Sequence, residues 1–148
     1  MGTVVAVCLS EERGVSKHDV GSGMLRAGWG LEGDAHAGNW HRQVSLLGVE
    51  SIAKGRAQGF DVGPGSYAEN ITTRGLVLNE LPMGTRMRLG EALVEVTQIG
   101  KQETEPSSIQ KLIGDSAIPR EGIFVRVILG GRVAPGDGIV VLRSSTQD

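Results

Sequence analysis

The sequence predicts a mostly β protein whose strands form a closed or nearly closed barrel, with two or three short helices. Glycine supplies 23 of the 148 residues, and these glycines separate short runs rich in Val, Ile and Leu. Roughly seven or eight such runs have the length and composition of strands. At most one segment could serve as the long crossover helix that repeated α/β units require. Closing the strands into a barrel removes the exposed edges of an open sheet.

In the first half of the chain, apolar periodicity predicts strands and one helix. Residues 3–10 form a nearly continuous apolar, β-branched run, typical of a strand buried on both faces, and residues 24–29 are interpreted as a short strand. Residues 43–47 resemble a strand that leads into a helix, and Gly59 should end this helix. Within the helix, Glu50 and Lys54 are spaced as an ion pair one turn apart.

In the second half, turn signals delimit the predicted elements. Gly90 and Glu91 form the turn of a hairpin, and Gly130 with Gly131 indicates a second, tight hairpin. Pro106 favours the start of a short helix that ends at Gly114. The predicted strands are residues 66–73, 86–89, 92–99, 122–129 and 139–142. We predict one domain over residues 1–148, of which 143–148 form a polar tail.

Composition argues against several classes of function. The formal net charge is −2, so neither a nucleic acid nor an anionic membrane is expected as a partner. No apolar run approaches the roughly 20 residues that span a bilayer, and the N-terminus lacks the basic region of a signal peptide. Cys8 is the only cysteine, which excludes an intramolecular disulfide and suits the cytoplasm.

Residues 30–45, which read GLEGDAHAGNWHRQVS, are the best candidate for a functional loop. Glycines at three positions allow the backbone to approach a ligand closely. The polar side chains of the loop include Asp34, His36, His41, Arg42 and Gln43. The spacing D-x-H-x4-H is one ligand short of a closed zinc site. We therefore interpret both histidines as hydrogen-bonded groups suited to proton transfer, and we predict no metal.

Three segments together resemble the small bacterial MOSC-domain proteins, named after the C-terminal domain of molybdenum-cofactor sulfurase. They are GLEGDAHAGNWHRQVSLLGVESI at 30–52, GSYAENITTRGLVLNELPMGTRMRLGEALVEVTQIGK at 65–101, and IPREGIFVRVILGGRVAPGDGI at 118–139. The resemblance implies a mostly β domain built on a closed or nearly closed barrel. It also implies a link to molybdenum-cofactor sulfuration, to sulfur carriage as a cysteine persulfide, or to reduction of N-hydroxylated compounds.

The sequence departs from this family at the position of the expected cysteine, shortly after the QIGK segment. Glu103 stands where the family thiol would be, and Ser107 where a second would be. A persulfide needs a thiolate, and a thiolate-ligated molybdenum centre needs a soft sulfur ligand. The resemblance alone thus suggests the molybdenum cofactor, whereas the missing cysteine argues against it and against sulfur carriage.

These observations predict acid–base chemistry on a small anionic metabolite, with carbon–sulfur elimination as the favoured reaction. The sulfur comes from the family resemblance and not from a residue pattern. The predicted catalytic residues are His36, Lys101 and Glu103. The predicted substrate-binding residues are Lys17, Asp34, His41, Arg42, Gln43, Glu69, Asn70 and Arg120. Arginines among them could bind carboxylate or phosphate through two nitrogens.

Two alternatives remain open at this stage. The protein could bind a pterin-like or other phosphorylated ligand without reacting it, or Cys8 could take over the role of the missing thiol in a sulfur carrier. The sequence is also compatible with a homodimer.

Overall fold

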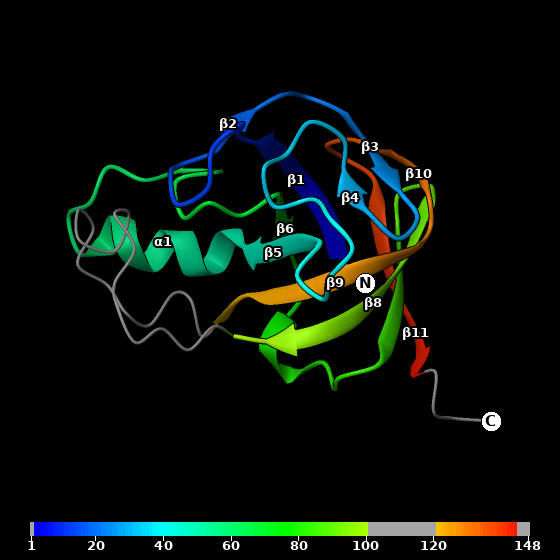
Figure 1. Cartoon of the computed structure of the whole chain (residues 1–148). Coiled ribbons are helices and arrows are strands. Elements are labelled where there is room, and N and C mark those ends of the chain that lie inside the picture. The colour runs from blue at the N-terminus through cyan, green and yellow to red at the C-terminus, as the bar shows by residue number, and fades with distance from the viewer. Residues whose placement is uncertain (1, 101–120, 145–148) are drawn as a thin grey trace.

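The computed structural model describes residues 2–100 and 121–144, with side chains up to residue 142 (Figure 1). Of the predicted site residues, Lys101, Glu103 and Arg120 lie outside the described residues. The helix predicted to begin at Pro106 lies outside them as well.

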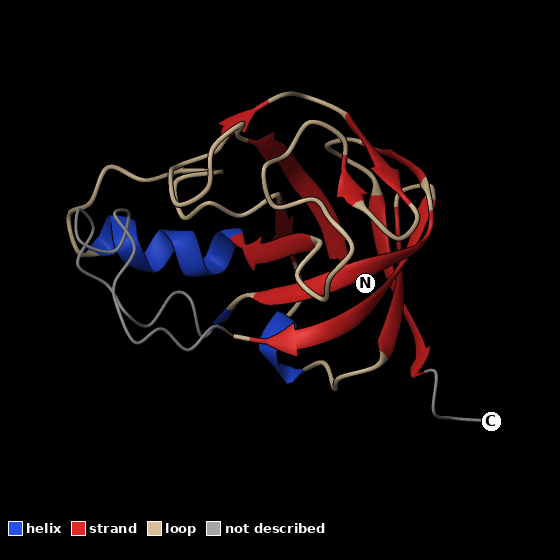
Figure 2. Ribbon diagram, in the orientation of Figure 1, coloured by secondary structure: helices blue, strands red, loops and turns tan. Residues whose placement is uncertain are grey.

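Within this part of the chain the elements are strands, one α-helix and one turn of 3-10 helix (Figure 2). In chain order they are β1 (Gly2–Leu9), β2 (His18–Asp19), β3 (Gly23–Arg26), β4 (Gly30–Leu31), β5 (Val44–Gly48), α1 (Val49–Ala57), β6 (Ile71–Arg74), η1 (Leu78–Glu80), β7 (Thr85–Leu89), β8 (Ala92–Ile99), β9 (Ile123–Leu129), β10 (Gly131–Val133) and β11 (Gly138–Ser144).

Among the described residues, seven strands close into a barrel in the order β11-β7-β8-β9-β5-β6-β1, and β11 pairs with β1 to complete the ring. The mostly β barrel predicted from the sequence is therefore confirmed. All of these pairs are antiparallel except β5 with β6. A parallel pair needs a crossover connection, and α1 provides it between these two strands.

The barrel interior is a continuous apolar core. Its fully buried side chains include Val7, Leu46, Ile71, Met87 and Val125, which come from strands spread around the ring. Alternate residues of each strand point inward, so one face of every strand supplies this core. A smaller cluster of Leu47, Ile52 and Val62 attaches α1 to the outside of the barrel.

The hairpin predicted at Gly130 and Gly131 is wrong, because β10 pairs with β3 in a separate three-stranded sheet with β4. Gly130 serves a close approach between chains and not a tight turn. A Cβ atom at this position would lie 2.7 Å from the carbonyl oxygen of Leu25 in β3. A glycine is required at this position, but the reason is contact with a segment distant in sequence.

The predicted Glu50–Lys54 pair is also not the contact that these residues make. The Glu50 carboxylate accepts the backbone N–H of Gly75 at 2.8 Å, and Lys54 Nζ lies 2.9 Å from Glu121 Oε2. Both partners are far away in sequence, and a helix pair worth about 0.3–0.5 kcal/mol is easily exchanged for them. β11 continues to Ser144, two residues into the predicted polar tail.

None of the helices in the described part of the chain combines the length and the apolar character needed to cross a bilayer.

Candidate functional site

The loop between β4 and β5 carries the candidate site, and its two ends are held together at the backbone. Gly30 has a φ of +129°, and a Cβ atom there would lie 2.7 Å from the carbonyl oxygen of Gln43. Only glycine permits both this backbone angle and this close approach. The N–H of Gly38 donates to the carbonyl of Trp29 at 2.8 Å, which holds the middle of the loop near β4. The predicted functional loop is thus a shaped segment anchored at several points.

The centre of the site is a buried ion pair beside a histidine. Lys17 Nζ lies 2.7 Å from Asp34 Oδ1, and both side chains have no exposed surface. The same ammonium lies 3.2 Å from Ser10 Oγ and 3.2 Å from His36 Nδ1. The His36 side chain keeps 24% of its surface exposed. The structure therefore brings together Lys17, Asp34 and His36, all of which the sequence predicts for the site.

Asp34 organises this group through both of its carboxylate oxygens. Oδ1 accepts the N–H of Ser10 at 3.2 Å as well as the Lys17 ammonium, and Oδ2 accepts the N–H of His36 at 3.0 Å. Burial alone would raise the pKa of Asp34, but the hydrogen bond and the charge of Lys17, with the two backbone bonds, hold it below its ordinary value. The carboxylate is consequently ionised around neutral pH, so its negative charge compensates that of the buried Lys17 ammonium.

A second glycine places Lys17 over this loop. Gly65 has a φ of +85°, and any Cβ atom there would collide with the Lys17 carbonyl and approach Cys8 Sγ to 3.2 Å. The Gly65 carbonyl accepts the N–H of Lys17 at 2.8 Å. Two segments about 50 residues apart thus meet backbone to backbone, a contact that no local sequence pattern reveals.

Trp40 covers His36 from one side. Their rings stack with an interplanar angle of 6° and centroids 6.5 Å apart, and Trp40 Nε1 donates to the His36 carbonyl at 2.8 Å. The Arg13 guanidinium lies 5.2 Å from the centre of the Trp40 ring, and Arg13 Nε donates to the Ala35 carbonyl at 3.3 Å. Arg13 is not among the site residues predicted from the sequence. Its proximity to Trp40 depends on the folding of two loops and has no sequence signal.

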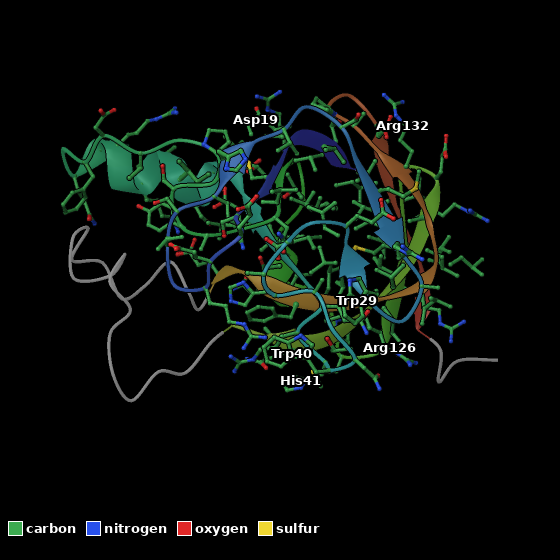
Figure 3. All side chains as sticks on the ribbon, turned by 45° about the horizontal axis from the view of Figure 1, so that its top comes forward. Asp19, Trp29, Trp40, His41, Arg126 and Arg132 are labelled. Carbon is green, nitrogen blue, oxygen red and sulfur yellow. The ribbon has the colours of Figure 1, made fainter. Side chains whose placement is uncertain are left out.

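His41 and Arg42 form a neighbouring group around a neutral amide. His41 Nε2 lies 3.1 Å from Gln98 Oε1, and Arg42 Nε donates to the same oxygen at 2.9 Å. The Arg42 guanidinium also lies 5.1 Å from the centre of the Phe124 ring. Trp40 connects the two groups, since its ring meets that of His41 edge-on at 5.9 Å; Figure 3 shows these two side chains together. Gln98 is a member of this group that sequence reasoning missed.

The other predicted ligand-binding residues have buried partners within the protein. Gln43 Oε1 accepts the N–H of Val127 at 2.9 Å. Asn70 links two strands, because its Oδ1 accepts the N–H of Ser45 and its Nδ2 donates to the Cys8 carbonyl. Glu69 and Asn70 both precede β6, and among the described residues their hydrogen bonds go to different segments.

Glu69 lies in a turn that supplies donors but no cation. Oε2 accepts the N–H of Gly65 at 2.8 Å and the hydroxyl of Thr72 at 2.7 Å, while Oε1 accepts the N–H of Tyr67 at 3.2 Å. Burial raises the pKa of Glu69, and these hydrogen bonds offset the effect only in part. Its bonds give it a role in shaping the turn that meets Lys17.

Cys8 is a buried thiol in β1. Burial, and next the charges of Glu69 and Asp19, raise the pKa of its thiol to about 12, although Lys17 acts in the opposite direction. A thiol with this pKa is almost entirely protonated near neutral pH, and the thiolate is the reactive form.

Over residues 2–100 and 121–144, no group of three or more His, Cys, Asp or Glu side chains is arranged to hold a metal ion. A pocket of about 350 Å³ lies apart from the loop, between α1 and residues 75–79. Lys54 and Glu121 both line it and pair with each other, so their charges compensate.

The family model described as the MOSC domain matches residues 33–140. The fold is similar to that of the YuaD protein from Bacillus subtilis, with a TM-score of 0.73 and 20% identity over 95% of this chain and 96% of that one. YiiM from Geobacillus stearothermophilus has a TM-score of 0.73 and 19% identity, over 97% of this chain and 76% of that one.

YiiM from Escherichia coli is similar as well, with a TM-score of 0.69 and 24% identity over 99% of this chain and 72% of that one. At these identities the three structures establish a shared fold. No match was found among curated protein sequences.

Proposed function

We propose a function for this chain, which belongs to the MOSC domain family. It acts on a small anionic, sulfur-containing metabolite by acid–base chemistry centred on His36. The observation that carries the proposal is the placement of a partly exposed imidazole directly against a buried Lys17–Asp34 pair. An imidazole exchanges protons near neutral pH, and a fixed charge pair behind it holds the ring in one orientation.

Cationic side chains near His36 support an anionic substrate. Arg13 lies over Trp40, and Arg42 uses its Nε for Gln98. Within the described part of the chain, the terminal nitrogens of Arg42 make no hydrogen bond or ion pair, so they could bind a carboxylate. Lys101 and Arg120, which lie outside the described residues, are proposed as further cations because of their sequence positions.

Carbon–sulfur elimination is the reaction that we favour. A base removes a proton from the carbon next to the substrate's carboxylate or carbonyl group. The C–H electron pair forms a carbon–carbon double bond, and the C–S pair leaves with sulfur as a thiolate. The proton remains on the base until solvent exchange, which balances the step. Glu103 or Lys101 is proposed as this base, and His36 as a group that assists the departing thiolate.

The chemistry of Cys8 supports a mechanism without a persulfide. Its thiol is buried and its pKa is raised to about 12. Because a sulfur carrier needs an accessible thiolate, a role for Cys8 in place of the family cysteine is the weaker proposal.

The test is turnover of a panel of cysteine conjugates and other anionic thioethers, followed by release of thiol. His36→Gln and Glu103→Gln should each lower kcat/KM by about 10²- to 10⁴-fold, the usual contribution of a positioned acid or base. His18→Gln, at an exposed histidine of β2, is the matched control and should retain activity. Full activity of Glu103→Gln would leave Lys101 as the proposed base, whereas full activity of His36→Gln, or no turnover of any member of the panel, would remove this proposal.

A non-catalytic binder is the second candidate. It is favoured by Arg42, which bonds Gln98 through Nε and could bind a phosphate through its terminal nitrogens without any proton transfer. Calorimetry with pterin phosphates distinguishes the two. Binding without turnover in the thioether panel would favour the binder.

A further inference from the structure

The Lys17 ammonium has three N–H donors and no acceptor. Its neighbours within hydrogen-bond distance are Asp34 Oδ1 at 2.7 Å, Ser10 Oγ at 3.2 Å and His36 Nδ1 at 3.2 Å. Two of these atoms are oxygens that can accept. For the third contact to be a hydrogen bond, Nδ1 must carry a lone pair and no hydrogen. A neutral imidazole with an unprotonated Nδ1 carries its hydrogen on Nε2.

The charge state of Lys17 decides this assignment. A neutral amine could instead accept a hydrogen from Nδ1, but it would leave the buried Asp34 carboxylate without a compensating cation. The 2.7 Å separation of Lys17 Nζ and Asp34 Oδ1, with both side chains fully buried, is the geometry of an ion pair. The ammonium form therefore fits the surroundings of Lys17.

Asp34 competes with Lys17 for the same ring nitrogen. Its Oδ2 lies 4.0 Å from His36 Nδ1, beyond hydrogen-bond distance but close enough to be reached by a small ring movement. A carboxylate can only accept, so contact with Asp34 would demand a hydrogen on Nδ1. Lys17 and Asp34 thus favour opposite tautomers, and Lys17 holds the shorter contact.

The backbone of His36 leaves the ring little freedom to escape this choice. Its N–H donates to Asp34 Oδ2 at 3.0 Å, and its carbonyl accepts from Trp40 Nε1 at 2.8 Å. Trp40 also stacks on the ring with nearly parallel planes. The residue is thus fixed at both its backbone groups and on one ring face.

We propose that Lys17 is a positioning residue that fixes His36 in the Nε2–H tautomer, so that His36 donates a hydrogen bond to the substrate and does not act as the base. The tautomer follows from the contacts alone, whereas the role toward substrate rests on the proposed function. A neutral imidazole presented as a donor stabilises developing negative charge, as documented in other enzymes. In the elimination above, this charge develops on sulfur, and the proton must then be taken by a different residue.

The experiment is ring ¹⁵N NMR of histidine-labelled protein at neutral pH without substrate, with His36 assigned by the His36→Gln variant. In the wild type, Nδ1 should show a pyridine-like resonance and Nε2 a pyrrole-like one. In Lys17→Met the cationic donor is lost while the accepting Asp34 carboxylate stays beside Nδ1, so the ratio of Nε2–H to Nδ1–H forms should fall by about tenfold or more. Lys17→Arg, which keeps a cationic donor, should preserve the wild-type pattern.

Lys54→Met is the matched control, because this lysine is exposed and pairs with Glu121. It should leave the His36 resonances unchanged. Should Lys17→Met not fold, the double variant Lys17→Met with Asp34→Leu removes the cationic donor and the competing acceptor together, and its ratio of Nε2–H to Nδ1–H forms should fall below that of the wild type. A hydrogen on Nδ1 in the wild type, or an unaltered ratio in the folded variant that carries Lys17→Met, would overturn the proposal. Failure of the thioether panel would remove only the proposed reaction, since no substrate enters this measurement.

Discussion

Two buried carboxylates, Asp34 in the central loop and Glu69 in the turn beside it, behave in opposite ways. Each carboxylate accepts hydrogen bonds from two backbone N–H groups and from one side-chain donor of another residue. For Asp34 this donor is the Lys17 ammonium, and for Glu69 it is the neutral Thr72 hydroxyl. Burial raises the pKa of both, but among the described residues only Asp34 has a cation that reverses the effect. The comparison teaches that dipoles alone do not compensate burial here, whereas one ammonium does.

Lys17→Met should have the largest effect on stability, because it removes the cation that compensates the buried Asp34 carboxylate. We expect the free energy of unfolding at pH 7 to fall by about 3–5 kcal/mol, as for other broken buried pairs. Lys54→Met, at an exposed pair, should cost less than about 1 kcal/mol. Urea denaturation of the three proteins measures both values. If both variants lost the same small amount of unfolding free energy, the buried Lys17–Asp34 pair would not stabilise the site more than an exposed pair does.

Asp34→Asn should change the pH dependence of stability. The folded pKa of Asp34 is below its ordinary value of 3.8, so its contribution is present above pH 3.8 and is lost as pH falls through the folded pKa. The difference between wild type and Asp34→Asn should therefore narrow in acid, by about 1.4 kcal/mol for each unit of the shift. Unfolding at a series of acidic pH values tests this, and a constant difference would contradict it.

Glu69→Gln should show the opposite slope. The folded pKa of Glu69 is raised above 4.5, so the contribution of the protonated acid is present below pH 4.5 and is lost as pH rises through the folded pKa. Relative to the wild type, Glu69→Gln should gain stability as pH rises. One lost acceptor, worth about 1 kcal/mol, offsets part of this gain. Parallel slopes for the Asp34 and Glu69 variants would erase the distinction between the two carboxylates.

Much of the fold could be predicted from local patterns, because strand pairing between neighbours depends on nearby residues. The hairpin around Gly90 and Glu91 joins β7 to β8 as the sequence indicated, and α1 ends at Ala57 close to the predicted Gly59. The prediction failed where a local signal had a distant cause, as at Gly130, whose lack of a side chain serves contact with β3.

The site was predicted less completely, because its geometry arises from contacts between segments. Asp34 and His36 share a loop, and their proximity follows from the sequence. Lys17 was selected for its charge, yet nothing in its spacing indicates that Gly65 places it over Asp34. Gln98 lies in the predicted strand 92–99, but only the folded barrel brings it to His41. Sequence patterns can thus nominate residue types, while long-range packing decides which of them meet.

The pairing of β1 with β11 has a consequence for folding during synthesis. On the ribosome, residues 10–137 must be synthesised after β1 before β11 can pair with its edge. During this interval an unpaired strand edge is available to neighbouring nascent chains. Loss of β11 through premature termination would leave that edge open permanently, which makes truncated products natural clients of chaperones and proteases.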